Sequence, residues 1–191
     1  MRRAVFLDRD GVINRKAPTE SEYVTRWEQI DLLPGVGEAV ARLNRAGFCV
    51  YIVTNQRSVA KGLVTTSELE LVHQRLCARL EQEGARIDGV YYCPHELEPP
   101  CDCRKPKPGM LLRAAREHDI DLRVSWMIGD SGKDVQAGKQ AGCRTVHLVP
   151  SLTSTKDGAD VVAPSLLAAV QRILELTTDS GSDRFELAKR S

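Results

Sequence analysis

Two aspartates one residue apart, Asp8 and Asp10, stand at the end of the first apolar run of the sequence. Residues i and i+2 of an extended chain point the same way, so both carboxylates can converge where the strand ends, and Gly11 lets the chain turn. Adjacent carboxylates repel one another, so the pair requires a cation or a shared proton. Magnesium fits, because it binds one or two carboxylates together with water and phosphate. Taken alone, the motif is also compatible with an ordinary aspartate-rich turn.

The composition limits the classes of protein that fit. The chain has 191 residues, 42% of them hydrophobic, so we expect a single domain over residues 1–176 and a flexible tail over residues 177–191. The 27 basic and 26 acidic residues nearly cancel, which gives no global electrostatic case for binding nucleic acid or a membrane. The apolar run before Asp8 is too short for a signal peptide or a membrane span, so we expect a cytoplasmic protein.

Apolar runs and amphipathic segments alternate along the chain. Strands are predicted at residues 48–53, 87–92 and 124–128, and more weakly at 145–149 and 160–162. Helical patterns lie between them, and the last begins at Pro164. This alternation predicts an α/β fold, a Rossmann-like three-layer sandwich around a central parallel sheet. Residues 14–30 are too few for a separate cap domain and are expected to form a lip over the site.

Polar residues fall at the carboxyl ends of three predicted strands, where ligands bind in open α/β sheets. Phosphoryl transfer accounts for them together. Asp8 can attack phosphorus and form an aspartyl-phosphate, while Asp10 protonates the leaving oxygen and then takes a proton from water. Because a carboxylic acid ordinarily ionises near about pH 4, this role requires the site to raise the pKa of Asp10.

Further along the chain, other residues complete such a site. The Thr54 hydroxyl and the Asn55 main-chain N–H can contact phosphoryl oxygens, and a lysine from residues 105–107 can neutralise charge in the transition state. Asp130 would complete the magnesium site, and Asp134, one helical turn later, would orient Asp130 or a metal-bound water. Each feature alone has an ordinary reading as a turn, a helix cap or an exposed lysine. His73 has no evident partner and is assigned no role.

Four potential zinc ligands lie within eleven residues: Cys93, His95, Cys101 and Cys103. Three thiolates and one imidazole form a complete tetrahedral set for structural zinc, with no position open for catalysis. Free buried cysteines or a disulfide are the alternatives. Since Arg104 and Lys105 follow the last ligand, a zinc-bound loop would also fix residues that contact substrate.

These motifs resemble those of haloacid dehalogenase superfamily phosphatases, most closely the subgroup of D-glycero-D-manno-heptose 1,7-bisphosphate 7-phosphatases and histidinol phosphatases. The similar stretches are residues 6–11, 53–56 and 103–106, and Gly129 and Asp130 with Asp134. The resemblance implies a capless fold with a zinc-stapled loop, a nucleophile at Asp8 and an acid/base at Asp10. It implies phosphate contacts from Thr54 and Lys105, and magnesium on Asp8, Asp10 and Asp130.

In that subgroup the arginine beside the motif lysine recognises substrate, which implies this role for Arg104 and favours Lys105 over Lys107. The chain departs from many relatives at Arg57-Ser58, where they carry Ser-Gly, and in a longer segment at residues 18–22. Arg57 can contact a second phosphate, and Tyr23 corresponds to a substrate-loop position. The candidate substrate-binding residues are therefore Tyr23, Asn55, Gln56, Arg57 and Arg104.

The resulting expectation is a monomeric, magnesium-dependent phosphatase that also contains structural zinc. It would remove the 7-phosphate of D-glycero-D-manno-heptose 1,7-bisphosphate during the synthesis of nucleotide-activated heptose. Histidinol phosphate is the alternative substrate, and the preferred anomer of the heptose is open. A polynucleotide 3′-phosphatase is disfavoured by the neutral charge, and a non-catalytic zinc-stapled binding module leaves the strand-end aspartates unexplained.

Overall fold

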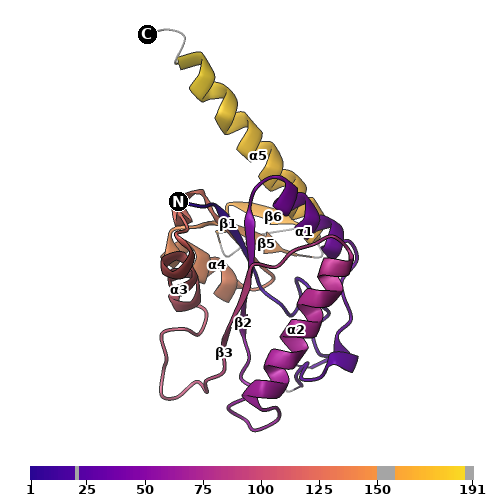
Figure 1. Ribbon diagram of the computed structural model, residues 1–191. Helices are drawn as coiled ribbons and strands as arrows, with labels where there is room; N and C mark the ends of the chain where they lie inside the picture. Colours follow the sequence, from indigo (N-terminus) through magenta and orange to yellow (C-terminus); the bar gives the residue numbers. More distant parts are fainter. Residues whose placement is uncertain (20–21, 150–157, 188–191) are drawn as a thin grey trace.

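Strands and helices alternate along the chain in the computed structural model, which describes residues 1–19, 22–149 and 158–187 (Figure 1). Within these residues six strands form one sheet in the order β3-β2-β1-β4-β5-β6, and every neighbouring pair is parallel. The strands are β1 (Ala4–Leu7), β2 (Cys49–Asn55), β3 (Gly89–Cys93), β4 (Trp126–Gly129), β5 (Arg144–Leu148) and β6 (Val161–Ala163). The predicted parallel α/β sheet is confirmed.

Helices cover both faces of the sheet. They are α1 (Val36–Arg45), α2 (Thr66–Gln82), α3 (Gly109–His118), α4 (Gly132–Ala141) and α5 (Leu166–Leu187), with single 3₁₀ turns η1 (Trp27–Gln29) and η2 (Leu122–Val124). Apolar residues of α1, α2 and α5 pack on one face, and those of α3 and α4 pack on the other. Alternate side chains of β1 pack into the hydrophobic cores on the two faces of the sheet: Val5 and Leu7 into the first, and Ala4 and Phe6 into the second. The three-layer sandwich follows from this alternation.

Local sequence signals set several of the element boundaries. Thr65 and Glu68 form a capping box at the start of α2, in which each side chain accepts a hydrogen bond from the other residue's main-chain N–H. The fourth strand starts two residues later than predicted, because the Asp121 carboxylate accepts the N–H of Arg123 and folds residues 122–124 into η2. Between β1 and α1, the described part of the lip contains one regular element, η1.

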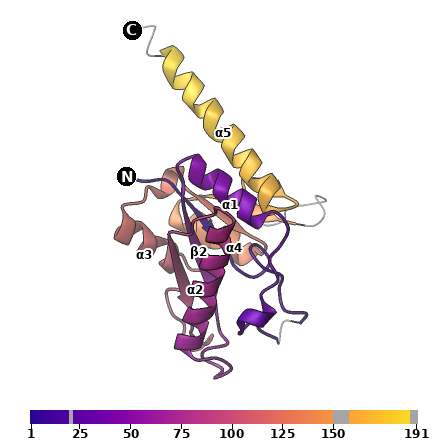
Figure 2. The ribbon, with the colours of Figure 1, turned by 45° about the vertical axis from the view of Figure 1, so that its right-hand side comes forward.

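Helix α5 is longer than the sequence indicated. Pro164 lies two residues before it, and Ser165 accepts the N–H of Ala168 at 3.3 Å as the cap. The helix then continues through the segment expected to be a loose tail and ends at Leu187, so that its second half projects beyond the sheet (Figure 2). Because packing of Leu166 and Ile173 stabilises its first turns, extending the helix requires only propagation, which costs less free energy than nucleation. No helix in the described part of the chain is long and apolar enough to cross a membrane.

The strand order determines where a site can form. The chain leaves β1 toward β2 on one side and leaves β4 toward β5 on the other, so a crevice opens at the carboxyl ends of β1 and β4. Asp8 follows β1 directly, Asp130 follows β4 directly, and Thr54 lies near the end of β2. The Asp8 main-chain N–H donates to the Ile128 carbonyl at 3.0 Å, which ties the first aspartate to β4. The predicted meeting of three strand ends is therefore confirmed.

Candidate active site

One cavity of about 640 Å³ lies at these strand ends. Every residue that the sequence suggested for catalysis, magnesium or substrate lines it: Asp8, Asp10, Tyr23, Thr54, Asn55, Gln56, Arg57, Arg104, Lys105, Asp130 and Asp134. A neighbouring cavity of about 850 Å³, between residues 15–31 and α2, shares only Tyr23 with this set. The chemistry-bearing residues thus converge in one place.

Lys105 is the buried cation of the site, with 2% of its side chain exposed. Its Nζ lies 2.8 Å from Asp8 Oδ1 and 2.6 Å from Asp134 Oδ1, and it donates to the Val53 carbonyl at 2.8 Å. Burial by itself would lower the pKa of Lys105, but Asp134 and Asp8 outweigh it and raise the pKa, so the ammonium stays charged. Lys107 instead forms an exposed pair with Asp102, and Lys105 is the lysine brought into the site.

Asn55 holds the main chain of Lys105 at two points. Its Nδ2 donates to the Lys105 carbonyl and its Oδ1 accepts the Lys105 N–H, both at 3.1 Å. This reciprocal pair joins the end of β2 to the loop that follows β3 and so positions the lysine. Contact between the Asn55 main-chain N–H and a phosphate stays a prediction.

Asp8 is a largely buried carboxyl group, with 14% of its side chain exposed, beside both a cation and a second carboxylate. Burial raises its pKa to about 7, Lys105 opposes that rise, and Asp134 adds to it. A divalent cation next to Asp8 would offset the effect of burial and favour the ionised form that a nucleophile needs.

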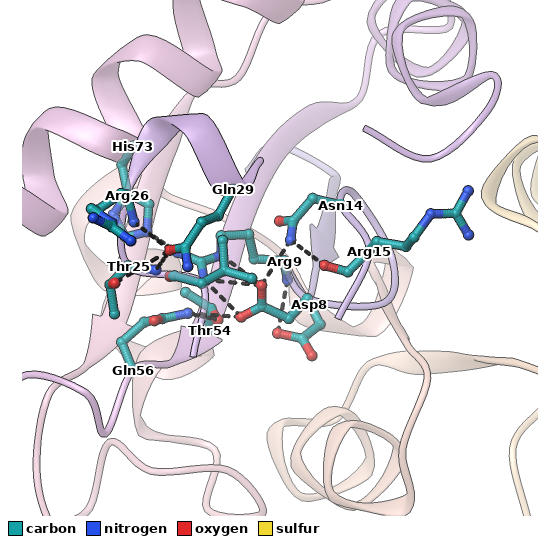
Figure 3. A network of polar contacts seen from close by, with 12 residues as sticks. Asp8, Arg9, Asn14, Arg15, Thr25, Arg26, Gln29, Thr54, Gln56 and His73 are labelled. Atoms are coloured by element: carbon teal, nitrogen blue, oxygen red, sulfur yellow. Dashed lines mark hydrogen bonds and ion pairs between the residues drawn. The ribbon is translucent and has the colours of Figure 1, made fainter. Parts of the chain in front are cut away.

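A set of donors holds the Asp10 carboxylate, and the donor residues Arg9, Asn14 and Gln56 are labelled in Figure 3. The fork of Arg9 donates to it at 2.8–3.1 Å, Asn14 Nδ2 at 2.9 Å and Gln56 Nε2 at 3.0 Å. Asp8 and Asp10 line the same cavity, but Asp8 belongs to a metal-sized carboxylate cluster with Asp130 and Asp134, whereas donors from other segments hold Asp10. Because both Asp10 oxygens already accept hydrogen bonds from protein donors, ligation of magnesium by Asp10 stays a prediction.

Sequence reasoning missed the residues that hold Asp10. Arg9 is fully buried, and its Nη1 lies 3.3 Å from His73 Nε2 on α2, while its Nη2 donates to the Val24 carbonyl at 3.0 Å. Burial, together with the charge of Arg9, lowers the pKa of His73 to about 3, so this imidazole is neutral. The one sequence signal was the position of Arg9 between two aspartates, and sequence alone does not show that an arginine will be buried.

Three carboxylates form a metal-sized cluster: Asp8, Asp130 and Asp134 each have an oxygen within 4.8 Å of the others. Asp134, predicted to orient Asp130 or a metal-bound water, pairs through Oδ1 with Lys105 Nζ at 2.6 Å and accepts the Ser131 hydroxyl through Oδ2 at 2.6 Å. Asp130 has a buried Oδ1 with no hydrogen-bond partner, whereas its Oδ2 pairs with Lys16. Hard oxygen donors and an unpaired buried carboxylate oxygen fit magnesium.

The four predicted zinc ligands also come together, and their ligand atoms all lie within 4.8 Å of one another. The Sγ atoms of Cys93 and Cys101 are 3.5 Å apart, as are those of Cys101 and Cys103, and His95 Nδ1 lies 3.2 Å from Cys103 Sγ. A tetrahedral zinc with about 2.3 Å Zn–S bonds places its ligands about 3.8 Å apart, so the set fits zinc. The cysteines are free, and the Sγ separations far exceed the roughly 2.05 Å of a disulfide bond.

The predicted substrate residues differ in their present partners. Arg57 Nε lies 2.6 Å from Glu96 Oε2, and Lys61 sits over the ring of Tyr23 at 5.4 Å. Arg104 has a buried Nη1 without a hydrogen-bond partner, which leaves a donor available to a ligand. Gln56 Nε2 donates to the Thr54 hydroxyl at 3.0 Å as well as to Asp10.

Comparisons with known proteins agree with this geometry. The HAD-hydrolase-like family model matches residues 102–169. The chain is 38% identical over 178 residues to the D-glycero-beta-D-manno-heptose-1,7-bisphosphate 7-phosphatase of Rhodopseudomonas palustris, covering 90% of this chain and 93% of that protein. The enzyme of the same name from Escherichia coli K12 is 37% identical, covering 89% and 93%.

Among solved structures, the D,D-heptose 1,7-bisphosphate phosphatase of Bordetella bronchiseptica in complex with magnesium and phosphate has a TM-score of 0.82 and 34% identity, covering 91% of this chain and 98% of that chain. The similarity in sequence and in structure therefore extends over both the sheet and the site. On this evidence the chain belongs to the D-glycero-D-manno-heptose-1,7-bisphosphate 7-phosphatase family of haloacid dehalogenase-like hydrolases.

Proposed function

We propose that this protein is a magnesium-dependent phosphatase that hydrolyses the 7-phosphate of D-glycero-D-manno-heptose 1,7-bisphosphate in nucleotide-activated heptose synthesis. The observation that carries the proposal is the buried chain Asp8–Lys105–Asp134 beside Asp130, in a cavity large enough for a phosphorylated sugar. The names of the relatives support the substrate and, within it, the β anomer. Haloacid dehalogenase-like phosphatases use magnesium, and a similar structure contains it.

In the first step Asp8 Oδ attacks phosphorus, and the bond from phosphorus to the sugar oxygen breaks. Asp10 gives that oxygen a proton, so the sugar leaves as an alcohol. In the second step water attacks the aspartyl-phosphate, Asp10 takes a proton from that water, and inorganic phosphate is released with Asp8 restored. For this role, one Asp10 oxygen has to give up a hydrogen bond from a protein donor and form one with the leaving oxygen instead. Gln56 is suited to the exchange because its Nε2 also donates to the Thr54 hydroxyl, so this amide keeps one hydrogen bond when it releases Asp10.

The cations of the site act on charge that develops at phosphorus. Lys105 lies against Asp8, so its ammonium is positioned to stabilise the phosphoryl oxygens during attack. When bound by Asp8 and Asp130, magnesium supplies positive charge that offsets the negative phosphate as it approaches the nucleophile. Arg104, with its free donor, is assigned to the second phosphate of the substrate.

Zinc on Cys93, His95, Cys101 and Cys103 would play a structural part. The loop that they anchor leads directly into Arg104 and Lys105, so zinc would fix the position of residues that contact the substrate. That the enzyme acts as a monomer in the cytoplasm stays a prediction from the sequence.

Turnover of a panel of phosphate esters tests the proposal. The panel contains both anomers of heptose 1,7-bisphosphate and histidinol phosphate, each with magnesium and with a chelator. We expect the β-bisphosphate to be preferred and the chelator to abolish turnover. A preference for histidinol phosphate would overturn the substrate assignment. Asp8→Asn should be inactive, and a variant that kept wild-type turnover would exclude Asp8 as the nucleophile.

A further inference from the structure

The active site contains a further lysine that the proposed mechanism does not use. Lys16, on the lip segment after β1, places its Nζ 2.6 Å from Asp130 Oδ2. The two side chains differ in exposure: 15% of Asp130 is accessible to solvent, against 53% of Lys16. A half-exposed lysine therefore pairs with a largely buried carboxylate.

The charges of the cluster show what this lysine does. Lys105 contacts Asp8 and Asp134, but Asp130 has Lys16 as its ion-pair partner. Three carboxylates and two ammonium groups leave one negative charge. Without the Lys16 ammonium, the Asp130 carboxylate, of which 15% is accessible to solvent, would lose this ion pair. Lys16 is thus the counter-ion that balances the charge of the largely buried Asp130 carboxylate.

The two lysines are not equally free to move. Lys105 is buried and donates a hydrogen bond to the Val53 carbonyl, and Asn55 forms two hydrogen bonds with its main chain. Lys16 has a flexible stem in a cavity that opens to solvent. The Lys16–Asp130 pair sits over Gly11, which has φ +93°, and a Cβ there would collide with Asp130 Oδ2 and Lys16 Cε. The pair therefore occupies the space directly above the turn that follows Asp8.

We propose that Lys16 is the exchangeable counter-ion of Asp130. Its ammonium neutralises Asp130 in the metal-free protein, would be released when Asp8 and Asp130 hold magnesium, and would then contact the second phosphate of the substrate. This inference rests on the proposed function. Two cations at one carboxylate repel each other, and the doubly charged ion attracts Asp130 more strongly than an ammonium does. Because Lys16 lines the cavity, the displaced ammonium stays within reach of an anionic ligand. Magnesium and bisphosphate should then favour each other's binding.

Calorimetric titration of the substrate-free protein with Mg²⁺ tests the exchange. Lys16→Met should bind Mg²⁺ about five-fold more tightly than the wild type, because the ion no longer displaces an ammonium. Lys16→Arg keeps the charge and should stay near the wild type. Lys133→Met removes a positive charge from the same cavity but not from Asp130, so its affinity should change much less. Unchanged or weaker binding by Lys16→Met would overturn the exchange.

Thermal unfolding gives a second readout that does not depend on activity. In chelator, Lys16→Met should unfold at a lower temperature than the wild type, because Asp130 loses its counter-ion. Added Mg²⁺ should raise its Tm by more than it raises that of the wild type. Equal Mg²⁺-induced shifts in the two proteins would contradict the inference.

The substrate step is tested by comparing heptose 1,7-bisphosphate with heptose 7-phosphate at saturating magnesium. In Lys16→Met, KM for the bisphosphate should rise about five-fold with little change in kcat, while KM for the monophosphate stays nearly constant. An equal effect on both substrates would refute the contact with the second phosphate. Asp130→Asn separates this inference from the proposed function: if it binds Mg²⁺ like the wild type, the assignment of the metal site itself is wrong.

Discussion

The buried Asp8 carboxyl group should make the stability of the metal-free protein depend on pH, and Asp8→Asn should abolish this dependence. Burial raises the pKa of Asp8 to about 7 from its usual 3.8, against the pull of Lys105 and with the help of Asp134. The native state therefore holds a proton on Asp8 over a pH range in which the unfolded state has lost it. By linkage, the free energy of unfolding falls as pH rises from about 4 to about 7 and changes little above that range.

The size of this effect follows from the shift. A difference of about three pKa units corresponds to about 4 kcal/mol at pH values above both pKa values, of which about 1.5 kcal/mol is already present near pH 5. Asn cannot ionise and mimics the protonated acid. The stability of Asp8→Asn relative to the wild type should therefore increase by about 2.5 kcal/mol between about pH 5 and about pH 8.

Urea denaturation in the presence of a chelator, across that pH range, measures the difference. Asp31→Asn is the control, because Asp31 is an exposed carboxylate paired with Arg15 and its removal should leave the pH profile parallel to that of the wild type. Saturating magnesium should flatten the wild-type profile of stability against pH, because the cation favours the ionised form of Asp8. Parallel profiles for the wild type and Asp8→Asn in chelator would refute the claim that burial governs this carboxyl group.

Asp134→Asn removes one of the two carboxylates that neutralise Lys105, so the free energy of unfolding in urea should fall by about 3 kcal/mol, and a loss below about 1 kcal/mol would argue against a buried ion pair. Cys103→Ser should abolish bound zinc, measured by mass spectrometry of the purified protein, and raise KM about tenfold by loosening the loop before Lys105; full zinc content would contradict the ligand set. Arg9→Lys keeps the charge but loses the fork on Asp10, so kcat should fall at least about tenfold, whereas the exposed Lys107→Met should match the wild type.

Much of the architecture could be predicted because its signals are local. The period of apolar residues marks strands and helices, and the capping box of Thr65 and Glu68 marks the start of α2. General rules of parallel sheets then place Asp8, Thr54 and Asp130 at one edge. The zinc ligands were recognisable for the same reason, since all four lie on one short stretch of chain.

The partners of these residues were decided only by the tertiary structure. Arg9 is hydrophilic by type, yet it is buried where α2 brings His73 against it and the residue after β2, Gln56, bonds its partner Asp10. The lip segment folds back so that Lys16 meets Asp130. Sequence spacing therefore determined which groups reach the site, whereas ionisation, orientation and pairing depend on burial and on neighbours distant in sequence, which only the packed structure specifies.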